Sequence, residues 1–281
     1  MSSILDDLKM QYKLGGAAFR LLFWNVLCFL VSLLFFYQFQ LGVFTFPDWI
    51  ALTSDPNVLI TKPWTLISYA FFHFSFGHLF FNMIVLHFAS MLFLTFFNPK
   101  QFIGLYLLSA LFSGIAFVVG YYFLHLSSAM VGASGAIMAI LVATTTYRPL
   151  MSIRLLFFGN VKLWHITAVI LVLDFMQFRI ENTGGHIAHL AGAFFGFIFI
   201  KLLQNGIDLS RILNNPFQKS KRTPFKKVHK NYPKSASKPS SRIVVKDKTQ
   251  QQIDEILDKI SQSGYDCLTQ EEKEFLFKAG K

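Results

Sequence analysis

Charged residues are scarce in this chain of 281 residues. Charged side chains make up 15% of it, whereas 53% of its residues are hydrophobic and 34 are phenylalanine. A disordered chain has far fewer apolar residues than this, and an ordinary soluble domain needs more polar residues to cover its surface. The composition therefore excludes the first class of protein and argues against the second.

Cysteine and processing signals are scarce as well. The chain has 2 cysteines, too few for a disulfide framework, and Cys28 in an apolar run and Cys267 in a polar region do not suggest a metal pair. No A-x-A-like cleavage site follows the polar start of the chain. We therefore expect residues 1–20 to form a cytoplasmic N-terminal segment and the first apolar run to stay in the protein.

Long apolar runs, in contrast, are abundant. A helix needs about 20 apolar residues to cross a hydrocarbon core about 30 Å thick. Three runs of that kind are followed by three shorter ones, the fifth with Asp174 near its end. They cover residues 21–41, 79–97, 102–124, 132–147, 163–178 and 187–200. The sequence therefore predicts an all-α membrane domain of six helices within residues 21–204.

The basic residues between these runs indicate an orientation, because cytoplasmic loops collect Lys and Arg. With the N-terminus inside, the outer side receives only Lys62 and Arg179. The inner side receives Lys9, Lys13, Arg20, Lys100, Arg148, Arg154, Lys162 and Lys201. This asymmetry supports six spans with both termini in the cytoplasm.

The last part of the chain is polar and basic. Residues 205–250 are predicted to form a disordered linker, because residues 219–248 contain eleven Lys or Arg and one acid, interspersed with Pro and Ser. Anionic lipid and nucleic acid both suit such a stretch, and its place directly after a membrane helix favours lipid. Residues 251–281 are predicted to form a short helical segment, with a capping box from Thr269 to Glu272.

The loop at residues 42–77 is long and rich in aromatic residues. Apolar stretches that are too short to span a membrane are typical of its interface. We expect this loop to lie in the outer leaflet rather than above it.

Polar groups inside membrane segments are costly, so each one calls for a reason. The fourth run opens with Gly132-Ala133-Ser134-Gly135-Ala136. Small residues allow close helix packing, which is the structural interpretation. The functional interpretation is a nucleophile, because backbone N–H groups at the start of a helix are free to hold an oxyanion. The G-x-S-x-G elbow of soluble hydrolases is absent, since Ala136 stands at its second glycine.

The sixth run carries His186 and His189 at its start. Ala188, Gly192 and Gly196 form a small-residue face beside His189. A lone histidine there is more often a structural hydrogen-bonding group. Two histidines three residues apart also fit a metal, but the chain has no H-E-x-x-H motif and few membrane carboxylates, so we expect no metal.

The second run carries His78 and Asn82, one turn apart on one helix face. Both can donate hydrogen bonds to a developing negative charge, and hydrogen bonding between helices is the structural alternative. Counting 1.5 Å per residue from each cytoplasmic helix end places Asn82, Ser134 and His189 at nearly one level, roughly 10 Å below the outer surface. Independent structural residues have no reason to agree in depth.

Taken together, these motifs resemble the rhomboid family of intramembrane serine proteases over residues 21–201. The resemblance is carried by the stretch from Trp64 through His73, by His78 and Asn82, by Gly132-Ala133-Ser134-Gly135, and by Ala188-His189 with Gly192 and Gly196. It implies a six-helix bundle around a short central helix that bears the nucleophile. It further implies a bacterial-type inner-membrane protease without metal or organic cofactor, which cleaves in or near the transmembrane helices of other membrane proteins.

The resemblance also implies roles for single residues. Ser134 would be the nucleophile, and His189 the general base and then the acid for the leaving amine. His78, Asn82 and the backbone N–H of Ser134 would form the oxyanion hole. Such a dyad needs no carboxylate, and we expect none at its depth. Close backbone approach is implied at Gly132 and Gly135.

Two positions depart from the family pattern. Thr65 follows Trp64 where many members have Arg, and Met138 stands where many have an aromatic residue that stacks on the catalytic histidine. Since a thioether can also pack on an imidazole edge, we expect altered efficiency rather than loss of activity. His186 has no assigned role.

Two other functions compete with the protease. A rhomboid-like pseudoprotease would bind membrane clients without cleaving them, but such proteins usually lack one or both of Ser134 and His189. A small transporter would show inverted repeats and intramembrane carboxylates, and we find neither pattern in the sequence.

Overall fold

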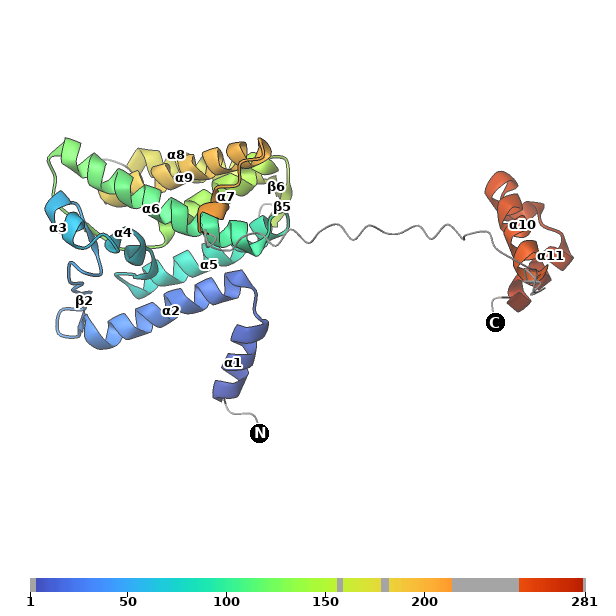
Figure 1. The fold of residues 1–281 in the computed structure, drawn as a ribbon, viewed down its shortest axis with the longest axis horizontal. Coiled ribbons are helices and arrows are strands. Elements are labelled where there is room, and N and C mark those ends of the chain that lie inside the picture. The colour runs from blue at the N-terminus through green and yellow to red at the C-terminus, as the bar shows by residue number, and fades with distance from the viewer. Residues whose placement is uncertain (1–3, 156–158, 178–181, 214–247, 280–281) are drawn as a thin grey trace, which may run out of the picture. The chain divides into compact units, whose positions relative to one another are not determined.

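The computed structural model describes residues 4–155, 159–177, 182–213 and 248–279. The chain divides into two compact units, Met1–Lys221 and Arg222–Lys281 (Figure 1). The first unit holds all of the predicted membrane helices. The second holds the predicted C-terminal helical segment.

Four helices of the first unit are long and apolar enough to cross a membrane, and two shorter apolar helices accompany them. The long ones are α2 (Ala17–Phe35), α5 (Phe76–Leu94), α6 (Pro99–Leu124) and α9 (Thr183–Gln204), and the short ones are α7 (Ser134–Tyr147) and α8 (Leu163–Gln177). The six follow the order of the predicted runs. The all-α membrane bundle is therefore confirmed.

The first apolar run does not stay helical over its whole length. Helix α2 ends at Phe35, and the residues after it form the hairpin of β1 (Tyr37–Gln38) and β2 (Val43–Phe44). The helix predicted to reach residue 41 is thus shorter, because the aromatic rings of Tyr37 and Phe44 face each other across the hairpin at 4.9 Å.

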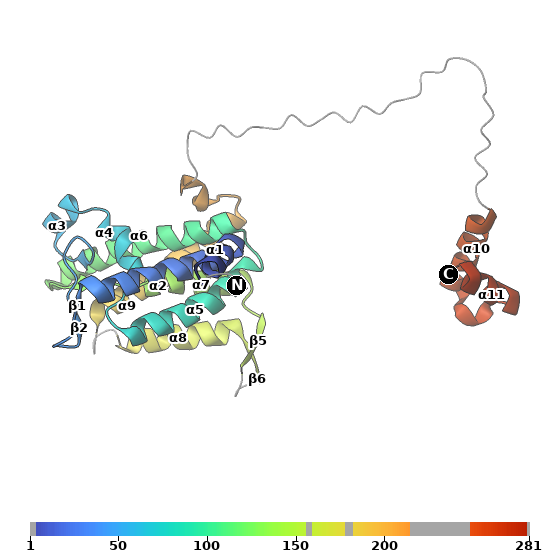
Figure 2. The same cartoon turned by 90° about the horizontal axis from the view of Figure 1, so that it is seen from below.

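Short elements cap the two ends of the bundle. One end carries the β1–β2 hairpin and α3, and the opposite end carries the hairpin of β5 and β6 (Figure 2). Besides β1 and β2, the short elements in the described residues of this unit are α1 (Ile4–Leu14), β3 (Leu52–Thr53), α3 (Pro56–Thr61), α4 (Thr65–Ser68), η1 (Tyr69–Phe71), β4 (Ala129–Met130), β5 (Ser152–Leu155), β6 (Gly159–Lys162) and η2 (Leu209–Leu213). Strand β3 pairs with β4, which ties the first loop to the chain just before α7.

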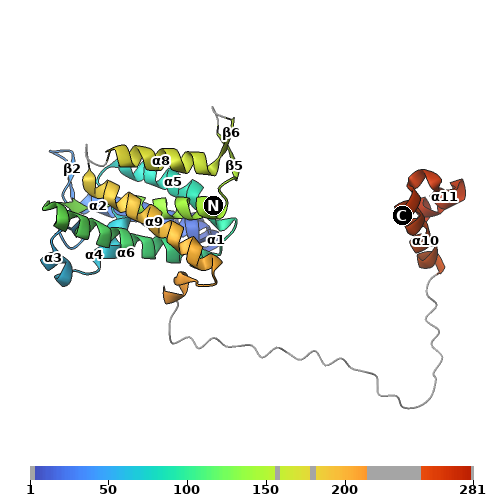
Figure 3. The ribbon, with the colours of Figure 1, turned by 90° about the horizontal axis from the view of Figure 1, so that it is seen from above.

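Helix α7 is the centre of the bundle. It packs against α5, α6, α8 and α9 (Figure 3), and its residues from Gly135 through Thr144 are all buried. At 14 residues it is about 21 Å long, too short to span a membrane by itself. A short helix enclosed by longer ones can hold a polar group away from lipid.

Small residues bring α7 and α9 into backbone contact. A Cβ atom at Gly192 would lie 2.0 Å from the carbonyl oxygen of Gly135, and one at Gly196 would lie 2.2 Å from that of Ala139. No larger residue fits at either glycine without moving a backbone. Because both contacts advance along the two helices together, α7 and α9 run in the same direction.

The outer faces of the long helices are apolar and exposed. Large side chains on α2, α5, α6 and α8 that point away from the bundle include Phe35, Phe81, Phe88, Phe123 and Phe175. An exposed apolar surface of this extent is what a lipid-facing bundle presents. The first unit is thus a multi-pass membrane domain.

The membrane unit extends beyond residue 204, where the sequence analysis placed the start of the linker. The η2 helix packs on α6, and Ser210 is buried against Gly104. The side chain of Gln101 donates a hydrogen bond of 3.2 Å to Asp208. The boundary was missed because a single glycine on α6, rather than an apolar run, accommodates this segment. Of the rest of the predicted linker, residues 214–247 lie outside the described residues, and residues 248–250 already belong to a helix that begins at Lys248.

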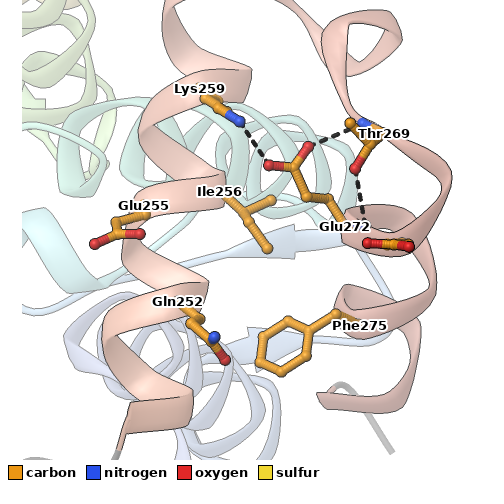
Figure 4. A pocket seen from close by; sticks show the side chains of 8 residues that line it. Gln252, Glu255, Ile256, Lys259, Thr269, Glu272 and Phe275 are labelled. Carbon is orange, nitrogen blue, oxygen red and sulfur yellow. Dashed lines mark hydrogen bonds and ion pairs between the residues drawn. The ribbon is translucent and has the colours of Figure 1, made fainter.

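The C-terminal unit is a helical hairpin of α10 (Lys248–Ser263), η3 (Tyr265–Cys267) and α11 (Gln270–Ala279) (Figure 4). Its predicted capping box is confirmed: the Thr269 N–H donates to Glu272 at 2.9 Å, and the Glu272 N–H donates to the Thr269 hydroxyl at 3.3 Å. Lys259 on α10 donates to the other Glu272 oxygen at 2.6 Å. That bond lowers the pKa of Glu272 and raises the pKa of Lys259.

Candidate active site

Ser134 and His189 face each other at the start of α7 and α9. The Ser134 Oγ lies 2.6 Å from the His189 Nε2, although the two residues are 55 positions apart in the sequence. Ser134 is the first residue of α7, so the first N–H groups of that helix have no intrahelical acceptor. A serine hydroxyl, an imidazole nitrogen and free N–H groups thus converge at one point.

The start of α9 is fixed by its own backbone. Asn182 adopts a left-handed conformation (φ 48°) and its side chain accepts a hydrogen bond of 3.3 Å from the Gly185 N–H. This cap sets the first turn, from which His186 and His189 project one turn apart. Ala188, between them and α7, is buried, and its carbonyl approaches Gly135.

A carboxylate completes the constellation, contrary to the expectation from sequence. Asp174 on α8 is buried, and its Oδ1 lies 2.7 Å from the Nδ1 of His189 and 2.7 Å from the Nδ1 of His186. His189 therefore contacts Ser134 through one ring nitrogen and Asp174 through the other. The prediction that no carboxylate lies at this depth was wrong.

The same depth arithmetic would have found Asp174 if it had been applied to α8. Asp174 lies twelve residues after Lys162, and His189 lies twelve residues before Lys201. Both distances correspond to about 18 Å of helix from the cytoplasmic end. Asp174 was set aside because it stands near the end of its apolar run, whereas α8 is a short helix whose last turns lie beside the first turns of α9.

His78 and Asn82 lie on the other side of the serine. The Ser75 hydroxyl caps α5 by accepting a 3.1 Å hydrogen bond from the His78 N–H, which places His78 in the first helical turn. The His78 ring packs on Phe74 with ring centres 4.4 Å apart. The Nδ2 of Asn82 is buried and has no hydrogen-bond partner among the described residues. A buried, unused N–H donor is suited to an anion that forms only during a reaction.

Gly132 connects His78 with the serine. Its φ of +143° is a conformation that residues with a side chain rarely adopt, and a Cβ atom there would lie 2.8 Å from the His78 ring. Its N–H donates a 3.0 Å hydrogen bond to the Tyr69 carbonyl, and the Tyr69 hydroxyl donates to Ala110 at 2.9 Å. Tyr69, which the sequence analysis did not single out, thus joins the first loop to the chain before Ser134.

The first loop is held by hydrogen bonds of its own. The Trp64 indole donates to the Trp49 carbonyl at 3.0 Å, and the buried Thr65 hydroxyl donates to the Lys62 carbonyl at 2.7 Å. Thr65, which departs from the family pattern, therefore closes a local turn. Met138, the second departure, is buried within α7.

A cavity of about 480 Å³ opens onto these groups. Its polar lining includes Ser134, His189, His78 and Asn82, and its apolar lining includes Phe44, Phe46 and Met130. A largely apolar lining with a few polar groups is typical of a binding site for a ligand that is mostly apolar.

Asp174, His186 and His189 are also residue types that bind metals, and their donor atoms lie within 4.8 Å of one another. At 2.7 Å, however, each imidazole nitrogen is already at hydrogen-bond distance from the carboxylate. A metal would have to replace the contact between Asp174 and His189. The expectation that no metal binds stays a prediction.

Comparison with known families agrees with this geometry. The Rhomboid domain family matches residues 61–205, more than half of the chain. The chain belongs to the rhomboid family. A second match, to a family of unknown function (DUF6576), covers residues 244–278. No curated protein matches the chain.

The rhomboid match contains every candidate site residue. Rhomboid proteins are mostly intramembrane serine proteases, and some members are pseudoproteases. Membership alone therefore leaves two functions open, and the side chains at the site must distinguish between them.

Proposed function

We propose that this rhomboid protein is an intramembrane serine endopeptidase that uses Ser134 and His189. The observation that carries the proposal is the 2.6 Å separation between the Ser134 Oγ and the His189 Nε2, because nucleophilic catalysis by serine requires a base within hydrogen-bond reach. A pseudoprotease has no need of this pair.

In the proposed reaction, the Ser134 oxygen attacks the carbonyl carbon of a peptide bond while its proton passes to the His189 Nε2. The tetrahedral intermediate collapses when His189 returns that proton to the leaving amine, which breaks the peptide bond and leaves an acyl-enzyme. His189 then takes a proton from water, which attacks the ester carbonyl. The bond to the Ser134 oxygen breaks, His189 returns the proton to that oxygen, and the second product leaves as a carboxylic acid. No metal or organic cofactor takes part in these steps.

The developing oxyanion would be stabilised by His78, Asn82 and the backbone N–H of Ser134. The unpartnered Nδ2 of Asn82 and the position of His78 against Gly132 support this assignment. Each donor of this kind typically contributes 10²- to 10³-fold to kcat. The glycines at 132, 135, 192 and 196 would serve by allowing the close packing that brings these groups together.

The proposed substrates are transmembrane segments of other membrane proteins, in keeping with a site inside a membrane domain. We further propose a bacterial inner membrane as the location, with both termini in the cytoplasm, from the distribution of basic residues. The basic stretch after the bundle would contact anionic lipid there rather than nucleic acid.

The test uses the purified full chain in detergent with a labelled transmembrane peptide as substrate. Wild type should cleave it, and a fluorophosphonate probe should label Ser134. Ser134→Ala and His189→Ala should each abolish cleavage, with a residual rate at least about 10³-fold lower.

Two variants serve as matched controls. Ser128 lines the same cavity as Ser134, and His87 is an exposed histidine on α5. Ser128→Ala and His87→Ala should keep wild-type activity. Folded wild type that neither cleaves a panel of substrates nor reacts with the probe would overturn the protease proposal and favour a client-binding pseudoprotease.

A further inference from the structure

We infer that Asp174 and His186 are positioning residues for the proposed serine–histidine pair. The site then works as a series of hydrogen-bonded side chains in the order Ser134, His189, Asp174 and His186. The inference rests on the proposed function and adds to it a carboxylate and a second histidine. Neither acts on the substrate. Asp174 acts through His189, and His186 acts through Asp174.

The proton positions on His189 follow from the contact with Asp174. An ionised carboxylate only accepts hydrogen bonds, so an imidazole nitrogen 2.7 Å from it must carry a proton. With its proton on Nδ1, a neutral His189 has a free lone pair on Nε2, which faces the Ser134 Oγ at 2.6 Å. This is the only tautomer in which His189 can accept the serine proton. Asp174 selects it.

His186 has a matching role on the other side of the carboxylate. Its Nδ1 lies 2.7 Å from the same Asp174 oxygen, and its side chain is buried. Donation from His186 gives the buried carboxylate a second hydrogen bond, which favours its charged form. The other oxygen, Oδ2, is buried and has no partner among the described residues, so both donors act on the one oxygen that orients His189.

The helix ends add to this arrangement. Asp174 contacts the first turns of α9, where the N–H groups carry partial positive charge. A carboxylate inside a membrane domain is costly unless it is paired, and residues of this kind are usually functional. A purely structural tie between α8 and α9 would need only one of the two histidines, whereas here the carboxylate also reaches the nitrogen opposite the nucleophile.

The kinetic test compares Asp174→Asn with wild type in the cleavage assay. Asparagine keeps the shape but loses the charge, and its amide can donate to Nδ1 and so favour the wrong tautomer. We expect kcat to fall about 10²- to 10⁴-fold while KM stays within about threefold, and labelling of Ser134 by the fluorophosphonate should slow in parallel.

The matched control is Asp208→Asn. Asp208 also joins two elements of the membrane unit, since it accepts from Gln101 on α6 and from Ser210 in η2, but it contacts no residue of the site. This variant should lower the thermal midpoint without changing kcat. An equal loss of kcat in both variants would show that Asp174 acts through stability alone and would overturn the inference.

His186 is tested by replacing or keeping its donor. His186→Asn places an amide N–H near the position of Nδ1 and should retain most of the activity. His186→Leu removes the donor and should lower kcat about tenfold, with KM little changed. Equal activity of the two variants would show that His186 is not a positioning residue.

A second readout does not depend on proteolysis. In full-length protein with ¹⁵N-labelled histidine, the His189 signals should report a protonated Nδ1 and an unprotonated Nε2, and Asp174→Asn should shift the proton toward Nε2. If wild type is inactive and unlabelled, the proposed function fails, and these spectra alone decide the role of Asp174. An active Asp174→Asn enzyme with unchanged His189 signals would overturn the inference and leave the protease intact.

Discussion

Helix α9 meets α7 and α8 in opposite ways. Against α7 it presents Gly192 and Gly196, and the backbones of the two helices lie in contact there. Against α8 it presents His186 and His189, which share one oxygen of Asp174. The contact with α7 is thus between backbones, whereas the contact with α8 is between three ionisable side chains.

The two contacts have different effects on the site: the first determines the position of Ser134, and the second determines the protonation of His189. Close packing of α7 on α9 determines where Ser134 lies, since the glycines allow no other separation of the two backbones. The contact with α8 determines which nitrogen of His189 carries a proton. Packing should therefore govern stability, and the polar contact should govern the rate of the chemical step.

The largest effect is expected from breaking the apolar contact. In Gly192→Leu the new side chain would begin 2.0 Å from the Gly135 carbonyl, so α7 and α9 must separate. We expect destabilisation of about 3 kcal/mol or more, seen as a lower thermal midpoint and aggregation during gel filtration.

Gly77→Ala is the control, because nothing lies within 4 Å of a Cβ atom at this helical position. It should be neutral or stabilising by up to about 1 kcal/mol. A Gly192→Leu protein as stable as Gly77→Ala would contradict the account of the contact.

The second-largest effect is expected when the polar contact between α8 and α9 is replaced by an apolar one. In the double variant Asp174→Leu with His186→Leu, an apolar pair replaces the buried polar one, which often leaves stability unchanged or improved. We expect the thermal midpoint to stay near that of wild type while kcat falls at least about 10²-fold. Loss of folding together with activity would mean that the polar contact also holds the helices together.

A smaller effect is expected at Gly132, where backbone conformation and His78 meet. Gly132→Ala forces a side chain onto a residue with φ of +143° and against the His78 ring. We expect about 1–3 kcal/mol of destabilisation and roughly a tenfold lower kcat, measured on the folded fraction. Gly16→Ala, at an open position, should change neither quantity.

The smallest effect belongs to the C-terminal unit, where Glu272 also joins two helices but is partly exposed. Its pKa is lowered from 4.5 by Lys259, so the pair's contribution is complete above that value and is lost as pH falls through the lowered pKa. The protection factors of α10 and α11 in the full chain, which compare each exchange rate with the unprotected rate at the same pH, should fall at low pH by no more than about threefold. In Glu272→Gln this dependence should be weaker, and a large loss of protection would contradict the assignment.

Much of the fold could be predicted because apolar length and charge distribution are local properties. The six helices follow from runs of residues that exclude charge, and the capping box at Thr269 follows from two residues three positions apart. The hairpin after Phe35 and the packing of η2 on Gly104 could not be predicted, since each depends on a partner distant in sequence or on a single small residue.

The candidate site was predictable to the extent that depth could be counted. Ser134, His189 and Asn82 line one cavity together with His78, as the common level of the first three suggested, although their roles stay predictions. Asp174 was missed because the depth count was not applied to its helix. Tyr69 was missed because it acts through its backbone carbonyl, and a backbone hydrogen bond cannot be predicted from the type of residue.

The parallel arrangement of α7 and α9 has a consequence for the register between them. The two close contacts join residues 135 to 192 and 139 to 196, each 57 positions apart. A slide of one helical turn would bring Ala188 to the Gly135 carbonyl or Ile200 to the Ala139 carbonyl, where a Cβ atom does not fit. That slide would move Ser134 about 6 Å along His189 and break the hydrogen bond between them. The glycines therefore favour one register of the two helices, and that register keeps Ser134 opposite His189.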